Sequence, residues 1–233
     1  MINLLRMLKR RADFAMLRRI SRQVVQDRLT YLPVKKLQRL ESAIRDTRAI
    51  PGDLLEFGVA LGGSGIILAQ DTQPGRRFHG FDVFAMIPPP TSDKDDAKSK
   101  ARYEVIKSGQ SEGIRGDRYY GYRPDLMSDV KAAFARHGSP VDGKLVILHK
   151  GFFEETWDDA AIDSIALAHI DCDWYDPVAF CLKVCADKLS DGGLILIDDY
   201  HDYGGCRAAV DEFLQHRPEF MMVPGLNPIL RRK

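Results

Sequence analysis

From residue 53 onward, short apolar runs of strand length alternate with longer amphipathic segments. This alternation is typical of βαβ units, in which helices cover both faces of a mostly parallel sheet. We therefore expect an α/β fold. The expected strands are Leu54–Gly58, Phe78–Asp82, Leu145–His149, Ile165–Ile170 and Leu194–Ile197. The expected helices lie near Ser64–Asp71, Asp125–His137, Pro177–Leu189 and Gly204–His216.

The C-terminal stretch follows another pattern. Phe220–Val223 and Ile229–Arg231 are short apolar runs on either side of Pro224–Pro228. Two such runs joined by a turn-forming segment are typical of a hairpin. We expect this hairpin to add antiparallel strands to one edge of the sheet.

The N-terminal residues differ from the rest of the chain in charge. The first forty residues contain eleven Lys and Arg against two Asp, a formal charge of +9, which leaves −8 for the remainder of a chain whose total is +1. We expect residues 1–50 to form a basic helical segment ahead of a domain of residues 51–233. Such a segment can dock on the domain or on another subunit, the interpretation we favour, or contact an anionic membrane or nucleic acid.

Composition limits the class of protein. No apolar run approaches eighteen residues, so a membrane span is not expected. Basic residues interrupt the first apolar stretch too early for a secretory signal. The four cysteines lack the paired C-x-x-C spacing of zinc or redox sites, so we expect them to be reduced and the protein to be cytoplasmic. They are Cys172, Cys181, Cys185 and Cys206.

Residues 83–124 interrupt the alternation. They contain three consecutive prolines from Pro88, then a charge-rich run, then GDRYYGYRP. A long irregular stretch inside a compact domain is usually functional or disordered. Because it directly follows the second strand, where α/β folds bind ligands, we predict a lid with a short helix around Lys98–Lys107. A floppy surface insertion is the alternative.

A glycine-rich turn follows the first strand. Glu56 and Gly58 lead to Gly62, Gly63 and Ser64, where a helix begins. Glycines allow a ligand to approach the backbone closely, and the helix start offers free N–H groups. The acidic residue disfavours the phosphates of a dinucleotide and suits a cationic amino group, such as that of S-adenosylmethionine. A tight connection without a ligand is the alternative.

Asp82 ends the second strand. Nucleoside-binding α/β proteins place a carboxylate at this position for ribose hydroxyls. The spacing from the first strand fits one βαβ unit, so Asp82 is a second candidate for binding the nucleoside, although a loop cap or a solvated charge is the alternative.

Acidic residues also follow the last two parallel strands. Ile165–Ile170 leads into Asp171 and Asp173, and Leu194–Ile197 leads into Asp198 and Asp199. If these strands are neighbours they lie about 4.8 Å apart, so their carboxylates would repel unless a proton, a hydrogen bond or a cation compensates. Oxygen ligands favour magnesium, manganese or calcium over zinc. Helix capping or salt bridges are the alternative. His169, inside an apolar run, is expected to be a core histidine.

Four blocks of this sequence resemble the macrocin O-methyltransferase family of metal-dependent, S-adenosylmethionine-using enzymes. They are Gly52–Val59 with Gly62–Ser64, Gly80–Phe84 with Pro88, Gly151–Thr156, and His169–Tyr175 followed by Gly192-Gly193, Asp198–Tyr200, Gly204 and Ala209–Phe213. The resemblance implies a Rossmann-like class I methyltransferase fold. It also implies that Asp171, Asp198 and Asp199 hold Mg²⁺ (or Mn²⁺).

The same resemblance implies that the methyl donor is held by Glu56–Ser64, Asp82, Gly151 and Phe152, and that the acceptor is a sugar hydroxyl of a glycosylated metabolite. The chain departs from the family at Asp176–Val178 and at Ala85–Pro88, both near the acceptor side. Relatives often associate, so we expect a homo-oligomer.

For the chemistry, we expect Asp173 to take the proton from the acceptor hydroxyl because it shares a short loop with Asp171. His201 is the second candidate. A catechol-type diol is the alternative acceptor. A nucleic-acid methyltransferase, a nicotinamide oxidoreductase and a non-catalytic binding protein are less favoured, and no nucleic-acid partner is expected.

Overall fold

The computed structural model describes residues 2–233. Its seven strands form one sheet in the order β3-β2-β1-β4-β5-β7-β6. The strands are β1 (Asp53–Phe57), β2 (Phe78–Asp82), β3 (Val146–Lys150), β4 (Ile165–Ile170), β5 (Leu189–Ile197), β6 (Phe220–Val223) and β7 (Ile229–Arg232). The first five pair in parallel, whereas β7 pairs antiparallel with β5 and β6. The predicted α/β sheet and its C-terminal hairpin are therefore confirmed.

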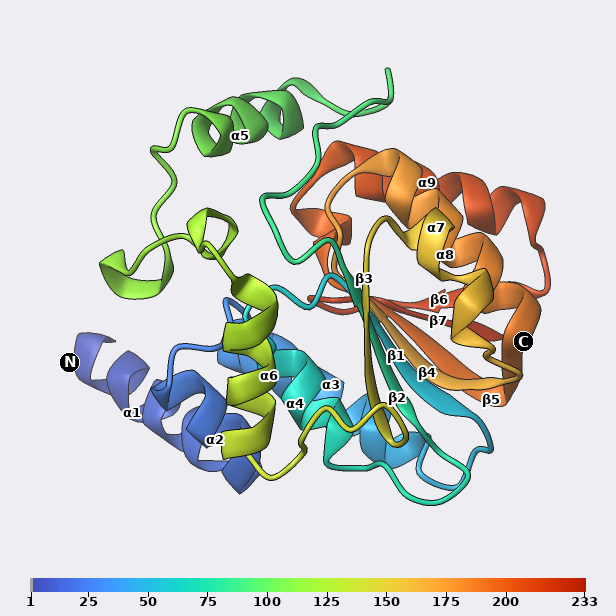
Figure 1. The fold of residues 1–233 in the computed structure, drawn as a ribbon, viewed down its shortest axis with the longest axis horizontal. Helices are drawn as coiled ribbons and strands as arrows, with labels where there is room; N and C mark the ends of the chain where they lie inside the picture. The colour runs from blue at the N-terminus through green and yellow to red at the C-terminus, as the bar shows by residue number, and fades with distance from the viewer. Residues whose placement is uncertain (1) are drawn as a thin grey trace.

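Helices cover both faces of the sheet (Figure 1). One face carries α1 (Ile2–Ala15), α2 (Arg19–Gln26), α3 (Val34–Asp46), α4 (Gly63–Ala69) and α6 (Leu126–Arg136). The other carries α7 (Phe153–Thr156), α8 (Tyr175–Lys188) and α9 (Gly204–His216). The remaining helices are α5 (Ala97–Lys107) and the 3-10 turns η1 (Ile114–Gly116), η2 (Tyr120–Tyr122), η3 (Asp158–Ala160) and η4 (Asp199–His201).

The central strands are buried on both faces, so they read as continuous apolar runs. Along β1, Leu54 packs into the core beneath α3, α4 and α6, whereas Leu55 and Phe57 pack into the core beneath α8 and α9. Successive side chains of a strand point to opposite faces. The same strand therefore holds both helical layers in place.

Strand β5 begins earlier than the sequence predicts. Leu189, rather than Leu194, is its first residue, and it pairs with Ile165 before the register shifts. Gly192 has a positive φ of 80°. Because glycine pairs usually mark turns, the irregular start of this strand was not visible in the apolar pattern.

The N-terminal helices pack on the domain. Helix α2 lies against α4, and the N–H of Gly63 donates to the carbonyl of Leu29 at 2.9 Å. Arg18 forms a salt bridge with Asp71 at 2.7 Å. Within residues 2–233, no helix has both the length and the apolar character that a membrane crossing requires.

Residues 83–124, which we call the lid segment, lie at the carboxyl ends of the strands and contain the predicted helix as α5. Asp95 accepts a hydrogen bond from the N–H of Tyr175 at 2.9 Å, and Asp96 accepts one from Gly204 at 3.1 Å. The indole of Trp174 donates to the carbonyl of Pro88 at 2.9 Å. The lid segment is thus tied to the starts of α8 and α9, and its helix α5 contacts α9.

Candidate active site

A cavity of about 790 Å³ opens at the carboxyl ends of β1, β2, β4 and β5. Ligands of open α/β sheets bind at this edge, where the strand order reverses. The tips of these strands form one wall of the cavity. Residues 29–36 and the lid segment supply most of the remaining lining, which is here called the opposite wall.

The glycine turn, Gly58–Ser64, begins the sheet wall. Gly58 has a φ of 94°, and a Cβ atom there would lie 1.9 Å from the carbonyl oxygen of Asp171, so only glycine fits. Gly58 and Ser64 line the cavity. Gly62 and Gly63 lie outside its lining, where Gly62 has a φ of 90° and precedes α4. Val59 and Ala60 also line the cavity, so the turn faces it with its first three residues and with Ser64.

Asp82 lies beside this turn in the cavity wall. Its Oδ1 accepts a hydrogen bond from the N–H of Phe84 at 2.6 Å, and its Oδ2 accepts one from Ala60 at 2.9 Å. Burial raises the pKa of Asp82, and these backbone N–H groups oppose that rise only in part. Each oxygen keeps a lone pair that a hydroxyl group could use.

Glu56 lies beneath the turn and does not line the cavity. Its Oε1 is 3.0 Å from Nδ1 of His169, and both side chains are fully buried. Burial lowers the pKa of His169, but the adjacent Glu56 carboxylate raises it above its ordinary value. Glu56 therefore ties β1 to β4 from inside the protein, and His169 is a core histidine with a partner.

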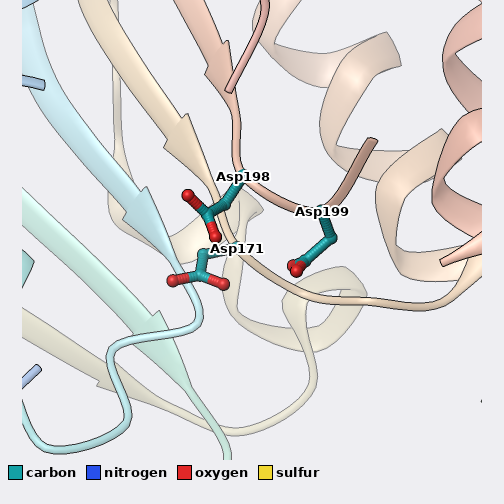
Figure 2. Close-up of side chains that lie close together, drawn as sticks. All are labelled: Asp171, Asp198 and Asp199. Carbon is teal, nitrogen blue, oxygen red and sulfur yellow. The ribbon is translucent and has the colours of Figure 1, made fainter. Parts of the chain in front are cut away.

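Three carboxylates converge at the tips of β4 and β5. One oxygen from each of Asp171, Asp198 and Asp199, here called the carboxylate cluster, lies within 4.8 Å of the others. Figure 2 shows the three side chains directed toward one small space. The cause is strand pairing: Ile170 lies opposite Ile197, and the N–H of Asp198 donates to the carbonyl of Ile170 at 2.9 Å.

The carboxylate cluster is short of positive charge and of hydrogen-bond donors. Burial, followed by repulsion from Asp198, raises the pKa of Asp171 well above its ordinary value and that of Asp199 to about 6. Oδ1 of Asp198 and Oδ2 of Asp199 are buried and accept no hydrogen bond from any described residue. Buried oxygens of this kind need a partner, and a hard divalent cation such as Mg²⁺ or Mn²⁺ matches their chemistry.

The structure adds a cation that the sequence did not predict. Nζ of Lys36, on α3, lies 2.8 Å from Oδ2 of Asp198 and 2.9 Å from Oδ2 of Asp202. The sequence places Lys36 among many basic residues of the N-terminal segment, 162 positions from Asp198. No local signal separates it from its solvent-exposed neighbours.

The two candidate bases differ in position. Asp173 is half-buried, lines the cavity and has a positive φ of 54°. Burial and then the nearby Asp199 raise its pKa well above the ordinary value. His201 is exposed and lies outside the cavity lining, where its Nε2 is 2.9 Å from the carbonyl oxygen of Gly225. Only Asp173 thus faces the space beside the carboxylate cluster.

Two further sequence candidates come from the loop after β3. Phe152 is 49% exposed and lines the cavity, whereas Gly151 does not. The opposite wall contains residues that sequence reasoning did not single out. They are Tyr31, Lys98, Arg102, Tyr119 and Tyr120. The YYGY run of the lid segment could have indicated the tyrosines, because the sequence predicts that this segment lies at the edge of the sheet where ligands bind.

Sequence comparisons with known proteins identify the family of this chain. Residues 6–219 match the Macrocin-O-methyltransferase (TylF) family. The chain is 31% identical over 193 residues to mycinamicin III 3''-O-methyltransferase of Micromonospora griseorubida, covering 79% of this chain and 69% of that protein. It is 29% identical over 195 residues to demethyldecarbamoylnovobiocin O-methyltransferase of Streptomyces niveus, covering 79% and 67%.

Solved structures show the same fold. The O-methyltransferase NovP superposes with a TM-score of 0.71 at 23% identity, covering 88% of this chain and 82% of that one. The calicheamicin methyltransferase CalS11 superposes with a TM-score of 0.63 at 19% identity, covering 97% and 90%. These neighbours confirm the predicted class I methyltransferase fold. The chain belongs to the macrocin O-methyltransferase (TylF) family and is an S-adenosylmethionine-dependent O-methyltransferase.

Proposed function

We propose that this enzyme methylates a sugar hydroxyl of a glycosylated small molecule, with a divalent cation held by the carboxylate cluster. The observation that carries the proposal is the position of Asp171, Asp198 and Asp199 in the cavity wall, next to the glycine turn and Asp82. A donor site and a hydroxyl-binding site would then share one cavity.

The relatives support the choice of acceptor. One is named for the 3''-hydroxyl of mycinamicin III, and another, from Streptomyces olivaceus, for the 4'-position of a rhamnosyl tetracenomycin. In the present chain, tyrosines from the lid segment and residue 31 line the wall opposite the carboxylates. Tyrosine combines apolar ring surface with a hydroxyl group, which suits the mixed faces of a sugar ring.

The donor would lie against the sheet wall. The backbone of Gly58 and the hydroxyl of Ser64 would face it, the free lone pairs of Asp82 would accept its ribose hydroxyls, and Phe152 would contact its base. When bound, S-adenosylmethionine supplies a methyl group on a positively charged sulfur, which needs no acid for activation. The protein therefore has to position the acceptor oxygen and remove its proton.

The carboxylate cluster fits Mg²⁺ or Mn²⁺ because it offers only oxygen ligands and has two buried oxygens without a hydrogen-bond partner. When bound, such a cation supplies Lewis acidity that lowers the pKa of a coordinated hydroxyl. Asp173 lines the cavity beside the cluster and would accept the proton that the hydroxyl loses.

The proposal is tested with purified protein, S-adenosylmethionine, Mg²⁺ and a matched acceptor set: a glycoside, its aglycone and a catechol. Mass spectrometry locates the added methyl group. We expect methylation of the sugar of the glycoside and none of the aglycone. Preferential methylation of the catechol would instead support an aromatic diol as acceptor, and full activity in excess EDTA would exclude the role of the cation.

A further inference from the structure

Lys36 is the one basic side chain of the described residues that forms a salt bridge with the carboxylate cluster. Its side chain crosses from α3 to the tip of β5, and the residue is only 9% exposed. Nζ donates to Oδ2 of Asp198 at 2.8 Å, to the carbonyl of Asp198 at 2.9 Å and to Oδ2 of Asp202 at 2.9 Å. An ammonium group has three N–H donors, so all three are used.

Because of these contacts, the two carboxylate oxygens of Asp198 lie in different environments. Oδ2 accepts from Lys36, whereas Oδ1 is buried and has no hydrogen-bond partner among the described residues. A cation held by the carboxylate cluster would therefore share Asp198 with an ammonium group. Two positive charges on one carboxylate repel each other, and the repulsion is stronger here than in water because the site is largely buried.

The backbone of α3 is held in place at Lys36 and one helical turn beyond it. Arg39, one helical turn further on, donates to the carbonyls of Asn227, Val223 and Pro224 at 2.7 to 2.9 Å. The side-chain amide of Asn227 donates to the carbonyl of Lys36 itself at 3.4 Å. The loop between β6 and β7 thus holds the backbone of α3 beside η4.

We propose that Lys36 is a permanent counter-charge for the carboxylate cluster: it keeps Asp171, Asp198 and Asp199 assembled when no divalent cation is bound, and it weakens the affinity of the cluster for that cation. The inference rests on the cation site proposed above. It makes the N-terminal segment part of the site, since the charge comes from α3 and not from the sheet.

An ordinary structural salt bridge predicts something different. It would stabilise the protein equally with and without a divalent cation, and its loss would leave the cation affinity unchanged. A lysine that merely orients Asp198 would, on removal, weaken cation binding. Of the three roles, only a counter-charge predicts that the cluster binds the divalent cation more tightly after Lys36 is removed. The reason is that the Asp198 carboxylate then no longer pairs with an ammonium group.

The test compares Lys36→Met with Lys35→Met. Methionine keeps most of the side-chain length and removes the charge. Lys35 is the neighbour on the same helix, is 49% exposed and pairs with Asp13 at the surface. For each variant, the melting temperature is measured in EDTA and in saturating Mg²⁺, and the affinities for Mg²⁺ and Mn²⁺ are measured by titration calorimetry without donor or acceptor.

We expect Lys36→Met to melt at a lower temperature than the wild type in EDTA, to regain most of the difference in Mg²⁺, and to bind the cation about tenfold more tightly. Lys35→Met should match the wild type in all three measurements. Lys36→Arg keeps the charge and should bind the cation within about threefold of the wild-type affinity.

Equal or weaker cation binding by Lys36→Met would overturn the inference while leaving the proposed function intact. Absence of Mg²⁺ and Mn²⁺ binding by the wild type would instead overturn the cation site and the inference with it. If Lys36→Met fails to fold in EDTA, the double variant Lys36→Met/Asp198→Asn removes one charge of each sign. The double variant should then fold in EDTA, and its failure to fold there would also overturn the inference.

Discussion

The two walls of the cavity are built in different ways. On the sheet wall, each acidic residue follows the end of a strand by one to three positions or ends the strand itself, as Asp82, Asp171, Asp173 and Asp198 do. On the opposite wall, the side chains come from residues 29–36 and from the lid segment, which no strand connects to the sheet. Parallel pairing fixes the first wall, whereas contacts between distant segments fix the second.

This difference suggests a division of work. Groups that must meet at one point, such as the carboxylate cluster, lie where the hydrogen-bonded register determines their separation. Groups that select the acceptor lie on segments joined to the body by side-chain contacts, which can vary without disturbing the sheet. Changes to the sheet wall should therefore act on catalysis or donor binding. Changes to the opposite wall should act on acceptor binding, except at Lys36, which pairs with Asp198.

The largest effect is expected for Asp199→Ala. Losing a proposed cation ligand should lower turnover by at least roughly a hundredfold, while the affinity for S-adenosylhomocysteine, measured by calorimetry, stays within about twofold. Excess EDTA should inhibit the wild type to the same degree. Asp191→Ala is the control and should retain full activity, because Asp191 is exposed near the start of β5, the strand that Asp199 follows.

Asp173→Asn tests the proposed base. The amide is nearly isosteric but is unable to take the proton, so kcat should fall by about 10² to 10³ while the Mg²⁺ affinity changes little. Asp176→Asn is the matched control, because Asp176 also lines the cavity but pairs with Thr91 of the lid segment at 2.6 Å. Equal losses of kcat in the two variants would contradict a specific role for Asp173.

The sequence predicted the sheet wall better than the opposite wall for a physical reason. Apolar runs place strand ends, and strand pairing then brings Asp171 and Asp198 together without knowledge of any side-chain contact. Lys36 and Arg102 had no comparable signal, because their positions depend on how α3 and α5 pack on the domain. For Glu56 the sequence predicted the place on β1 but not the direction of the side chain. The alternation of side chains along β1 directs Glu56 to His169 and away from the cavity.

Arg102 probes the opposite wall. It is half-buried, lines the cavity and donates from Nη2 to Ser111 at 2.9 Å, and no carboxylate of the described residues pairs with it. Its remaining N–H groups are therefore available to acceptor oxygens. Arg102→Gln should raise the KM for the acceptor about tenfold and leave kcat within about twofold. Arg118→Gln, exposed in the same segment, should change neither.

The pH dependence of the stability of the folded protein tests the carboxylate cluster of the sheet wall without any substrate. Asp199 has a folded-state pKa of about 6, above the roughly 3.9 of an unfolded aspartate. The folded protein thus binds more protons between these values, and its stability in EDTA should fall as the pH rises through about 6. Saturating Mg²⁺ should remove most of this fall, and Asp199→Asn should reduce it. Melting temperatures from pH 4 to 7 in both conditions measure the effect, and identical curves with and without Mg²⁺ would contradict it.

The smallest effect is expected where the two walls meet. Trp174 follows β4 and is 2% exposed, and its indole N–H donates to the carbonyl of Pro88 in the lid segment at 2.9 Å. Trp174→Phe keeps an aromatic ring but removes this hydrogen bond, which should cost about 1 kcal/mol and lower the melting temperature by about 2 to 4 °C. Because the bond joins the lid segment to the sheet wall, the KM for the acceptor should rise a few-fold while kcat and the Mg²⁺ affinity stay unchanged. A fall in kcat without a change in KM would mean that the lid segment positions the catalytic groups themselves, and the division between the two walls would then be wrong.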